Sequence, residues 1–372
     1  MRYPILIKLV GFLLILDCAT SNFSLTPQLI HQSIAGDNPD PPGVLIYHPA
    51  VLDALESLSV ITDGDTHKEF SGLYERPLPK ISQSLFVNHT NTLLLKTDTK
   101  VLPSVWGTLA PLASLKFMNF VFPRRSLFKF NEALKETHQN SQFPSILQRR
   151  YLNVNTQLMS VGTATMTAQW AESLRPTNFG LQVFHSQLDK HGGNRSVAID
   201  SLVIFGNFLF SEFDGLKLVH LPLSNNVTLL ILLSPQNTDN KPYKIPNQYD
   251  PIDLLKKGSP TNVEVQMPKI EFEYRTELVP QALNRMGIHR VHEKNADFGK
   301  LTLSQIKLSN MVHATSIRID EFGINEEPFE ILNFTLPTRS DKNNHVFVAN
   351  HPFYFSIVSE NHVLFSGEFL GP

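Results

Sequence analysis

Two histidines and a carboxylate close together are the first candidates for chemistry in this sequence. His289 and His292 lie three residues apart and Glu293 follows directly, residue types that can bind a transition metal. No further ligands follow at suitable spacing, so we interpret the set as a solvated helix end and predict no metal. The sequence also lacks the G-x-S-x-G elbow of serine hydrolases. The residues therefore predict neither an enzyme nor a cofactor.

Thiol chemistry and strong electrostatic binding are also unsupported. The only cysteine, Cys18, lies in an N-terminal apolar segment, so a chain without that segment has no disulfide and no thiol nucleophile. The formal net charge of −2 recruits neither nucleic acid nor a membrane, and we expect a monomer. Arg124, Arg125 and Lys129, with residues 149–150, could form a glycosaminoglycan patch, although short basic pairs are more often plain surface.

The N-terminus has the order of a secretory signal peptide. Arg2 and Lys8 precede an apolar run over residues 9–16, and small residues follow at 19–21. The run is shorter than the about 20 residues that span a bilayer. We therefore predict a signal peptide at residues 1–20 and a secreted, extracellular protein.

Five N-x-S/T sequons agree with export. In a secreted chain such sequons mark surface positions that can carry glycans, although chance supplies some of them. The sequence therefore predicts a glycoprotein. The sequons begin at Asn22, Asn88, Asn194, Asn226 and Asn333.

Helices are expected in the first part of the chain and near residue 280. Pro49 suits the first turn of a helix, and apolar residues continue at helical spacing to Val60. Residues 63–66 then end this helix and cap a second one. A further helix over residues 278–288 ends at Gly287, in the manner of a C-cap.

Long strands are expected in the second half. Residues 201–210 are nearly continuous in apolar side chains, the pattern of a strand buried on both faces. Residues 216–223 and 227–233 flank an Asn-rich turn and predict a hairpin. Residues 263–274 alternate cleanly and predict a strand with one wet face. Helices and strands without βαβ regularity indicate an α+β fold, in one large domain.

The C-terminal end resembles the serpin superfamily. Residues 351–357 and 363–369, with the final Pro372, are similar to the closing strand pair of that family. Weaker similarity extends back to about residue 42. Further segments resemble the family's strand, helix, loop and strand before its reactive loop, and a helix that carries a tryptophan. These segments are residues 263–274, 278–287, 295–298 and 312–314, and residues 166–173 with Trp170.

The resemblance implies a serpin fold of three β-sheets and about eight or nine helices, with an exposed reactive-centre loop near the C-terminus. It implies a serpin domain over residues 21–372 and a loop at about 321–345. In inhibitory serpins a protease cleaves this loop, and the loop then enters the large sheet as a new strand. The chain passes to Leu216 soon after Phe210, which implies a shortened region after residue 213.

The hinge of this loop departs from the inhibitory pattern. Inhibitory members continue after the hinge glycine with small residues, mostly alanine, whereas this chain carries bulky and charged ones. In the family's register every second residue from Ile324 would face the core. Burying an unpaired carboxylate costs several kcal/mol, and a proline removes a donor from the ladder of a central strand. The predicted hinge residues are Glu321, Gly323, Ile324, Glu326 and Pro328, and Glu330 follows in the same alternation.

The cleavage position is unfavourable as well. Counted from the hinge glycine, the bait bond falls at Pro337, after which serine proteases cut poorly. Beyond Thr338, Arg339 is a better bait for trypsin-like proteases. A glycan on Asn333 would obstruct both docking and insertion.

The region that opens the large sheet also differs from the family. His48 and Pro49 stand where the family has a Ser-Pro pair at the head of its second helix, and Gly206 is assigned to the position of an asparagine on the neighbouring strand. His313 keeps the family's identity, and His48 could partner it. The resemblance therefore implies a sheet that opens less easily.

These residues predict a secreted serpin-family protein without loop-insertion inhibition, acting as an extracellular binding, carrier or regulatory protein. The alternative is an inhibitor of trypsin-like serine endopeptidases with its bait near Arg339, acting without insertion. The sequence identifies no protease, protein partner or ligand.

Overall fold

The computed structural model describes residues 25–36, 42–71, 73, 86–138, 146–172, 174, 176–187, 194–235, 243, 245–328, 345–360 and 362–372. The predicted signal peptide lies outside these residues. So does most of the predicted reactive loop, from residue 329 to residue 344.

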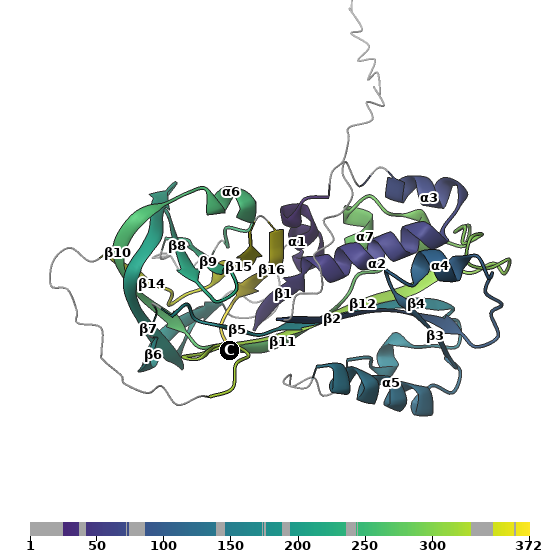
Figure 1. Ribbon diagram of the computed structural model, residues 1–372, viewed down its shortest axis with the longest axis horizontal. Coiled ribbons are helices and arrows are strands. Elements are labelled where there is room, and N and C mark those ends of the chain that lie inside the picture. Colours follow the sequence, from purple (N-terminus) through teal and green to yellow (C-terminus); the bar gives the residue numbers. More distant parts are fainter. Residues whose placement is uncertain are drawn as a thin grey trace, which may run out of the picture.

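A seven-stranded sheet runs through the middle of the molecule (Figure 1). Its strand order is β3-β2-β4-β12-β13-β5, and β11 pairs with β12 outside this path. The two central strands, β4 and β12, are parallel. The strands are β2 (Val87–Lys96), β3 (Ser114–Met118), β4 (Leu158–Met166), β5 (Ala168–Gln169), β11 (Ile270–Glu277), β12 (Leu308–Ile319) and β13 (Gly323–Ile324).

A nine-stranded sheet contains the other described strands, in the order β1-β16-β15-β9-β8-β7-β10-β14, with β6 paired to β7. The 20-residue β7 belongs to two groups, because it pairs with β6 and β10 along most of its length and with β8 at its end. The resemblance implied three sheets, and two of these are joined through β7 into one. The predicted α+β fold is confirmed. The strands are β1 (Gly43–Tyr47), β6 (Thr177–Gln187), β7 (Asn194–Phe213), β8 (Leu216–Pro222), β9 (Val227–Leu233), β10 (Ser259–Pro268), β14 (His345–Val348), β15 (Phe353–Ser359) and β16 (His362–Phe369).

The helices cover the seven-stranded sheet unequally. In Figure 1, α2, α3, α4 and α7 lie on one side of the sheet and α5 on the other. None of the described helices is both long and apolar enough to cross a membrane. The described residues form seven α-helices: α1 (Pro27–Ala35), α2 (His48–Ile61), α3 (Gly64–Ser71), α4 (Val105–Leu109), α5 (Arg124–Thr137), α6 (Pro251–Leu255) and α7 (Gln281–Arg285).

Several predicted elements are confirmed. Pro49 lies in the first turn of α2, and Gly287 follows α7 with a φ of +82°. The predicted hairpin is β8 and β9, turning at Asn225 and Asn226 with φ values of 57° and 58°. The closing strand pair is β15 and β16. Strong local signals, such as a proline at a helix start or paired asparagines in a turn, identify these elements without tertiary information.

Two segments differ from the prediction. Residues 166–173 do not form a helix: Met166, Ala168 and Trp170 are buried alternately at the end of β4 and along β5, the period of a strand. Residues 263–274 form two strands in different sheets, because β10 ends at Pro268, which has no N–H for a ladder, and β11 starts at Ile270.

The chain after residue 213 is short, as the sequence indicated. Asp214 and Gly215, with φ values of 50° and 77°, make a tight turn into β8. Upstream of this turn, β6 pairs with the first part of β7. No part of the edge is left open by this turn, since β7 and β8 pair up to Phe213↔Leu216.

We expect Gly43→Ala to lower the free energy of unfolding by about 3 kcal/mol. Gly43 has a φ of +144°, and an added Cβ would lie 1.9 Å from the Glu368 carbonyl oxygen. Gly107→Ala is the matched control, because no atom lies within 4 Å of its Cβ position in α4; it should stabilise the protein by up to about 1 kcal/mol. Urea unfolding of both variants measures the difference, and equal effects would contradict the close approach of β1 and β16.

Candidate functional site

The two central strands of the seven-stranded sheet pair directly, with no strand between them. β4 and β12 are in parallel register from Leu158↔Leu308 to Ala164↔Thr315. At the end of this seam where both strands begin, Gln157 N donates to Ser309 Oγ at 2.9 Å, and Lys307 N donates to Gln157 Oε1 at 3.2 Å. The place that a loop strand would occupy is therefore closed along most of its length.

The start of the hinge is already docked at the other end of the seam, where β4 and β12 end. Gly323 and Ile324 form β13, in which Ile324 pairs with Ile319 of β12 and with Ala168 of β5. Ile324 is fully buried in the core cluster between the sheets. Gly323 has a φ of +139°, and a Cβ there would lie 2.1 Å from the Ala168 carbonyl oxygen. Only glycine allows this approach.

Asn325 ends the docked segment and clips the two strands together. Its Nδ2 donates to the Met166 carbonyl at 2.8 Å, and its Oδ1 accepts from Arg318 N at 2.8 Å. Its own N–H donates to the Arg318 carbonyl at 2.8 Å. With a φ of 50°, Asn325 turns the chain out of the sheet. One buried side chain thus joins β4, β12 and the point where the loop leaves.

The next hinge residues lie outside the sheet. Glu326 is half-buried, its carbonyl accepting from the Arg318 guanidinium, while Glu327 and Pro328 are exposed. Because Ile324 faces the core, the period of a strand would turn residues 326 and 328 to the core as well if docking continued. Glu330, Asn333, Pro337, Thr338 and Arg339 lie outside the described residues.

Trp170 and Glu321 hold the base of the hinge. Trp170 Nε1 donates to the Asp320 carbonyl at 2.8 Å, and Lys269 Nζ lies 2.7 Å from Glu321 Oε2. The pKa of Glu321 is below its usual value. Desolvation by burial would raise this pKa, but the hydrogen bond and the positive charge of Lys269 outweigh that effect. Trp170 was assigned to a helix; the alternating burial of residues 166, 168 and 170 is the signal that identifies its strand.

In the sheet-opening region, the residue opposite His313 is Gly162 and not Gly206. His313 pairs with Gly162 on β4, and a Cβ on that glycine would lie 3.7 Å from His313 Nδ1. Gly206 lies on β7 and pairs with Val263 in the other sheet, so its assignment was wrong. Two apolar segments, residues 158–166 and 201–210, suit a buried strand equally, and only long-range pairing separates them.

His48 lies at the start of α2, beside Pro49, and does not hydrogen-bond His313. Its Nε2 lies 2.7 Å from Ser366 Oγ. His313 Nε2 instead accepts from the backbone N–H of Tyr47 at 3.1 Å, which leaves the proton of a neutral ring on Nδ1. Both histidines thus connect the large sheet region to the neighbouring strands β1 and β16.

A buried chain of polar groups continues from His48 to α1. Ser366 Oγ also lies 2.6 Å from His31 Nδ1, and His31 Nε2 lies 2.9 Å from Glu368 Oε1, which accepts from Asn247 Nδ2 at 2.7 Å. The distances fit one arrangement of hydrogen bonds: His48 Nε2–H donates to Ser366, Ser366 donates to His31 Nδ1, and His31 Nε2–H donates to Glu368.

These hydrogen-bonded side chains follow the serine, histidine and acid order of a hydrolase triad, but a substrate has no access to them. Ser366, His31 and Glu368 are at most 1% exposed, so a substrate carbonyl cannot reach the hydroxyl in the folded state. His48 Nδ1 has no hydrogen-bond partner among the described residues, as suits an unprotonated ring nitrogen. The network is therefore a structural one.

Burial keeps His48 and His313 neutral. It lowers the pKa of His48 well below the usual value, helped by nearby His31 and His313, and lowers the pKa of His313 to about 4. On the other side of the sheet, burial and then His89 lower the pKa of His138 to about 4. The ring nitrogens of His138 lie 2.6 Å and 2.9 Å from the hydroxyls of Thr163 and Thr165 on β4.

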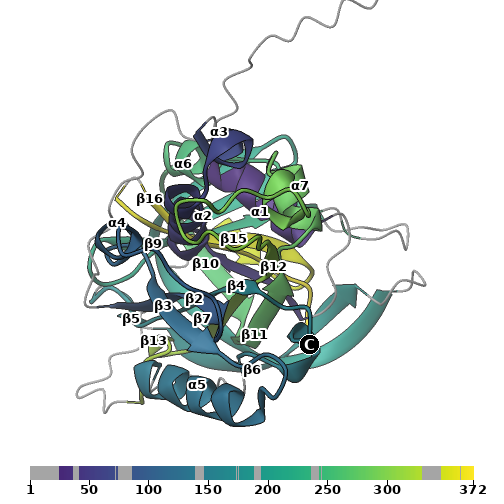
Figure 2. The same cartoon turned by 90° about the vertical axis from the view of Figure 1, so that its right-hand side faces the viewer.

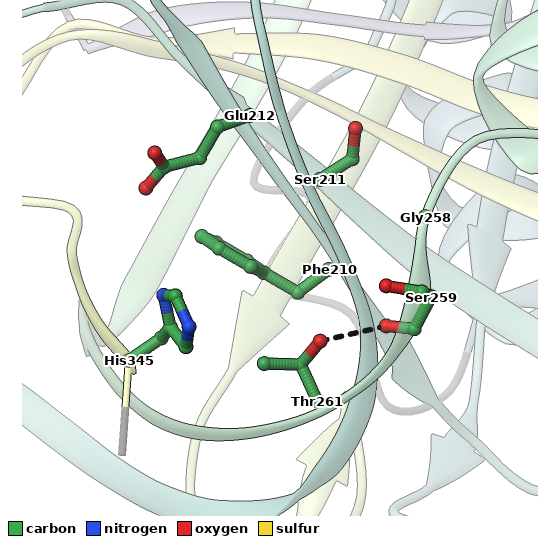
Figure 3. A pocket seen from close by; sticks show the side chains of 7 residues that line it. All are labelled: Phe210, Ser211, Glu212, Gly258, Ser259, Thr261 and His345. Carbon is green, nitrogen blue, oxygen red and sulfur yellow. Dashed lines mark hydrogen bonds between the residues drawn. The ribbon is translucent and has the colours of Figure 1, made fainter. Parts of the chain in front are cut away.

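An open cavity of about 470 Å³ lies where the chain returns from the loop (Figure 3). The rings of Phe210 and His345 are 5.3 Å apart, and Glu212 stands at the rim with its carboxylate 3.6 Å from Lys217 Nζ. An aromatic pair beside a carboxylate suits a small ligand with a positive charge. The lining residues are Phe210, Ser211, Glu212, Gly258, Ser259, Thr261 and His345.

The sequons fall in strands and turns of the described surface. Asn88 is exposed on β2, Asn226 is exposed in the β8–β9 turn, and Asn194 begins β7. Asn22 lies outside the described residues. Glycosylation of these positions remains a prediction.

We expect Asn325→Ala to lower the free energy of unfolding by about 2 kcal/mol more than Asn225→Ala does. Both residues have positive φ values, 50° and 57°, so the control carries the same backbone strain in an exposed turn. Only Asn325→Ala removes the two side-chain hydrogen bonds at the seam. Equal losses in urea unfolding would mean that the clip contributes nothing.

Stability should fall as pH drops from about 6.5 to about 4. His313 and His138 stay neutral in the folded protein until about pH 4, whereas the unfolded chain takes up both protons near pH 6.5. The stabilisation is complete above pH 6.5 and is lost on acidification, by roughly 3 kcal/mol for each group. His313→Gln should reduce the slope of unfolding free energy against pH; an unchanged slope would contradict the assignment.

Comparison with known proteins gives one consistent family. The family model for Serpin (serine protease inhibitor) matches residues 50–372. Serine protease inhibitor 88Ea of Drosophila melanogaster is 24% identical over 261 residues, 64% of this chain and 59% of that protein. Antitrypsin of Bombyx mori is 22% identical over 353 residues, 86% of each chain. The match to a serpin-like protein of Methanosarcina mazei spans only 54% of that relative.

Solved structures show the same fold. Serpin48 of the insect Tenebrio molitor has a TM-score of 0.74 at 17% identity, covering 94% of this chain and 96% of that one. Thyroxine-binding globulin in complex with thyroxine has a TM-score of 0.75 at 18% identity, covering 93% and 97%. Since the family model covers most of the chain and the seam, hinge and closing strands are all present, this chain belongs to the serpin family.

Proposed function

We propose that this serpin is a secreted protein that acts by binding, and that it does not inhibit proteases by loop insertion. The observation that carries the proposal is the stop at Asn325. The hinge fills one core position with Ile324, satisfies its polar groups on both strands, and then leaves the sheet.

Further insertion would replace favourable contacts with unfavourable ones. Insertion would break the hydrogen bonds of the Asn325 side chain to the Met166 carbonyl and the Arg318 N–H, and these buried groups would need new partners. In the same register Glu326 and Glu330 would enter the core, at a cost of several kcal/mol each when unpaired. Pro328 would then leave a gap in the ladder of a central strand.

Binding is supported by the cavity beside His345 and by one structural neighbour. The cavity offers aromatic faces and a carboxylate to a small ligand. Thyroxine-binding globulin, which shares this fold, carries thyroxine. Secretion is supported by the N-terminal signal pattern and the sequons. The partner or ligand would accordingly be extracellular.

The alternative is inhibition of trypsin-like proteases with Arg339 as bait. It is favoured by relatives named as inhibitors, such as Antitrypsin of Bombyx mori. An inhibitor that inserts its loop forms a covalent complex with the protease, whereas a substrate or a reversible binder does not. Because the alternative acts without insertion, a gel detects only an inserting inhibitor, and residual trypsin activity separates the alternative from binding alone.

We expect the protein without its signal peptide to form no SDS-stable complex with trypsin, and its melting temperature to change by no more than a few degrees after cleavage between Leu336 and Ser340. The reason is that the cut loop cannot pass Asn325, Glu326 and Pro328 into the closed seam. Mass spectrometry confirms the cut, and thermal unfolding compares cut with intact protein.

Arg339→Ala is the matched control for the bait. A loss of trypsin activity that the unchanged chain causes and this variant does not would establish the inhibitory alternative. A rise in melting temperature of tens of degrees after cleavage would show that the loop inserts despite its sequence. Alanine at residues 326, 328 and 330 together should not restore inhibition, because Asn325 still joins both strands.

A further inference from the structure

The surface at the start of α5 exposes aromatic side chains to water. Phe122 is 79% exposed and Phe128 is 67% exposed, and Val121 beside them is 42% exposed. Single exposed apolar residues are common, but a group of protruding ones marks a contact surface.

The fold holds these side chains outward rather than leaving them loose. Asn119 Oδ1 accepts from the N–H groups of Val121 and Phe122, each at 3.0 Å, which shapes the loop before the helix. The opposite side of α5 is fastened to the core by buried Phe130 and Leu134. In both views of the molecule α5 lies at its outer edge (Figures 1 and 2).

Phe122 and Phe128 lie in a segment whose charged residues are all positive. Residues 99–131 contain five lysines and arginines and no acidic residue, although the whole chain has a net charge of −2. Arg124, Arg125 and Lys129 are exposed on α5. Arg124 and Arg125 lie four and three residues before Phe128, spacings that place them beside it on the helix, and Lys129 follows it directly. The first acidic residue of the helix, Glu132, lies four residues after Phe128, at the C-terminal side of this group, and is 3.2 Å from Lys135.

We propose that this α5 surface, formed by Val121, Phe122, Arg124, Arg125, Phe128 and Lys129, binds anionic lipid surfaces. The phenylalanines enter the boundary between headgroups and acyl chains, while the longer basic side chains reach the phosphates. A lipid surface receives such protruding side chains without a complementary pocket. A glycosaminoglycan would use the same cations but leave both phenylalanines in water, so the aromatic exposure favours lipid. The proposal reverses the expectation from net charge that no membrane is bound.

The test uses the intact chain without its signal peptide and two kinds of vesicle, one of phosphatidylcholine alone and one with an equal part of phosphatidylserine. Co-sedimentation should show binding to the anionic vesicles that weakens at high salt. Phe122→Ser with Phe128→Ser should lower vesicle affinity roughly tenfold or more. Each of Arg124→Gln and Arg125→Gln should lower it roughly fivefold.

Matched controls keep the test specific. Leu303→Ser removes an apolar side chain that is 89% exposed elsewhere, and Lys294→Gln removes an exposed charge elsewhere; both should bind like the unchanged chain. Circular dichroism checks that every variant is folded. Absence of binding to anionic vesicles overturns the proposal. So does binding that the arginine variants lose and the phenylalanine variant keeps, particularly if heparin shows the same pattern, since that identifies a polyanion site.

Discussion

The direct pairing of β4 with β12 is the contact on which the rest of the molecule depends. It closes the centre of the seven-stranded sheet, and α2 and α5 pack on opposite sides of the sheet that results. In its middle, Gly162 faces His313 and contributes no side chain. The clips lie at the two ends, Gln157 at one and Asn325 at the other. The seam is thus held by backbone hydrogen bonds along its length and by side-chain hydrogen bonds at its two ends, where an inserting strand would first have to separate β4 from β12.

The hinge is stable where it lies because each of its groups has a partner. Gly323 permits an approach that a Cβ would prevent, Ile324 fills a buried position, and Asn325 bonds to both strands in a left-handed conformation that asparagine tolerates. A hinge that waits to insert would leave room for the next residues of a strand. Here the docked segment ends at Asn325, whose side chain already has its hydrogen-bond partners. The charged residues after it would gain no favourable contact by entering the sheet.

Local patterns in the sequence predicted much of the fold and part of the hinge. Pro49, the paired asparagines of the β8–β9 turn and the closing strands were identified because each is specified by neighbouring residues. Ile324, the first residue of the alternation, is buried in the core, and the described residues after Asn325 lie outside the sheet. Gly206 and Trp170 were misplaced because an apolar run does not reveal which strand lies beside it. The role of Asn325 depends on Met166, 159 positions away, and no local pattern predicts that contact.

The buried histidines extend the same argument to the ends of the domain. α1 has nine residues, too few for a stable helix in water. Ile30 and Ile34 pack into the core, and His31 reaches Ser366 and Glu368, 335 and 337 positions along the chain. The N-terminal helix is therefore stabilised by the last strand, and both belong to one cooperative unit that begins before the residues matched by the family model. Because Ser366 also meets His48 at the start of α2, the helix over the seam and the ends of the domain share one network of hydrogen bonds. Because burial lowers the pKa of His48 and of His313 in the folded protein, the fold and the closed seam should weaken together in acid.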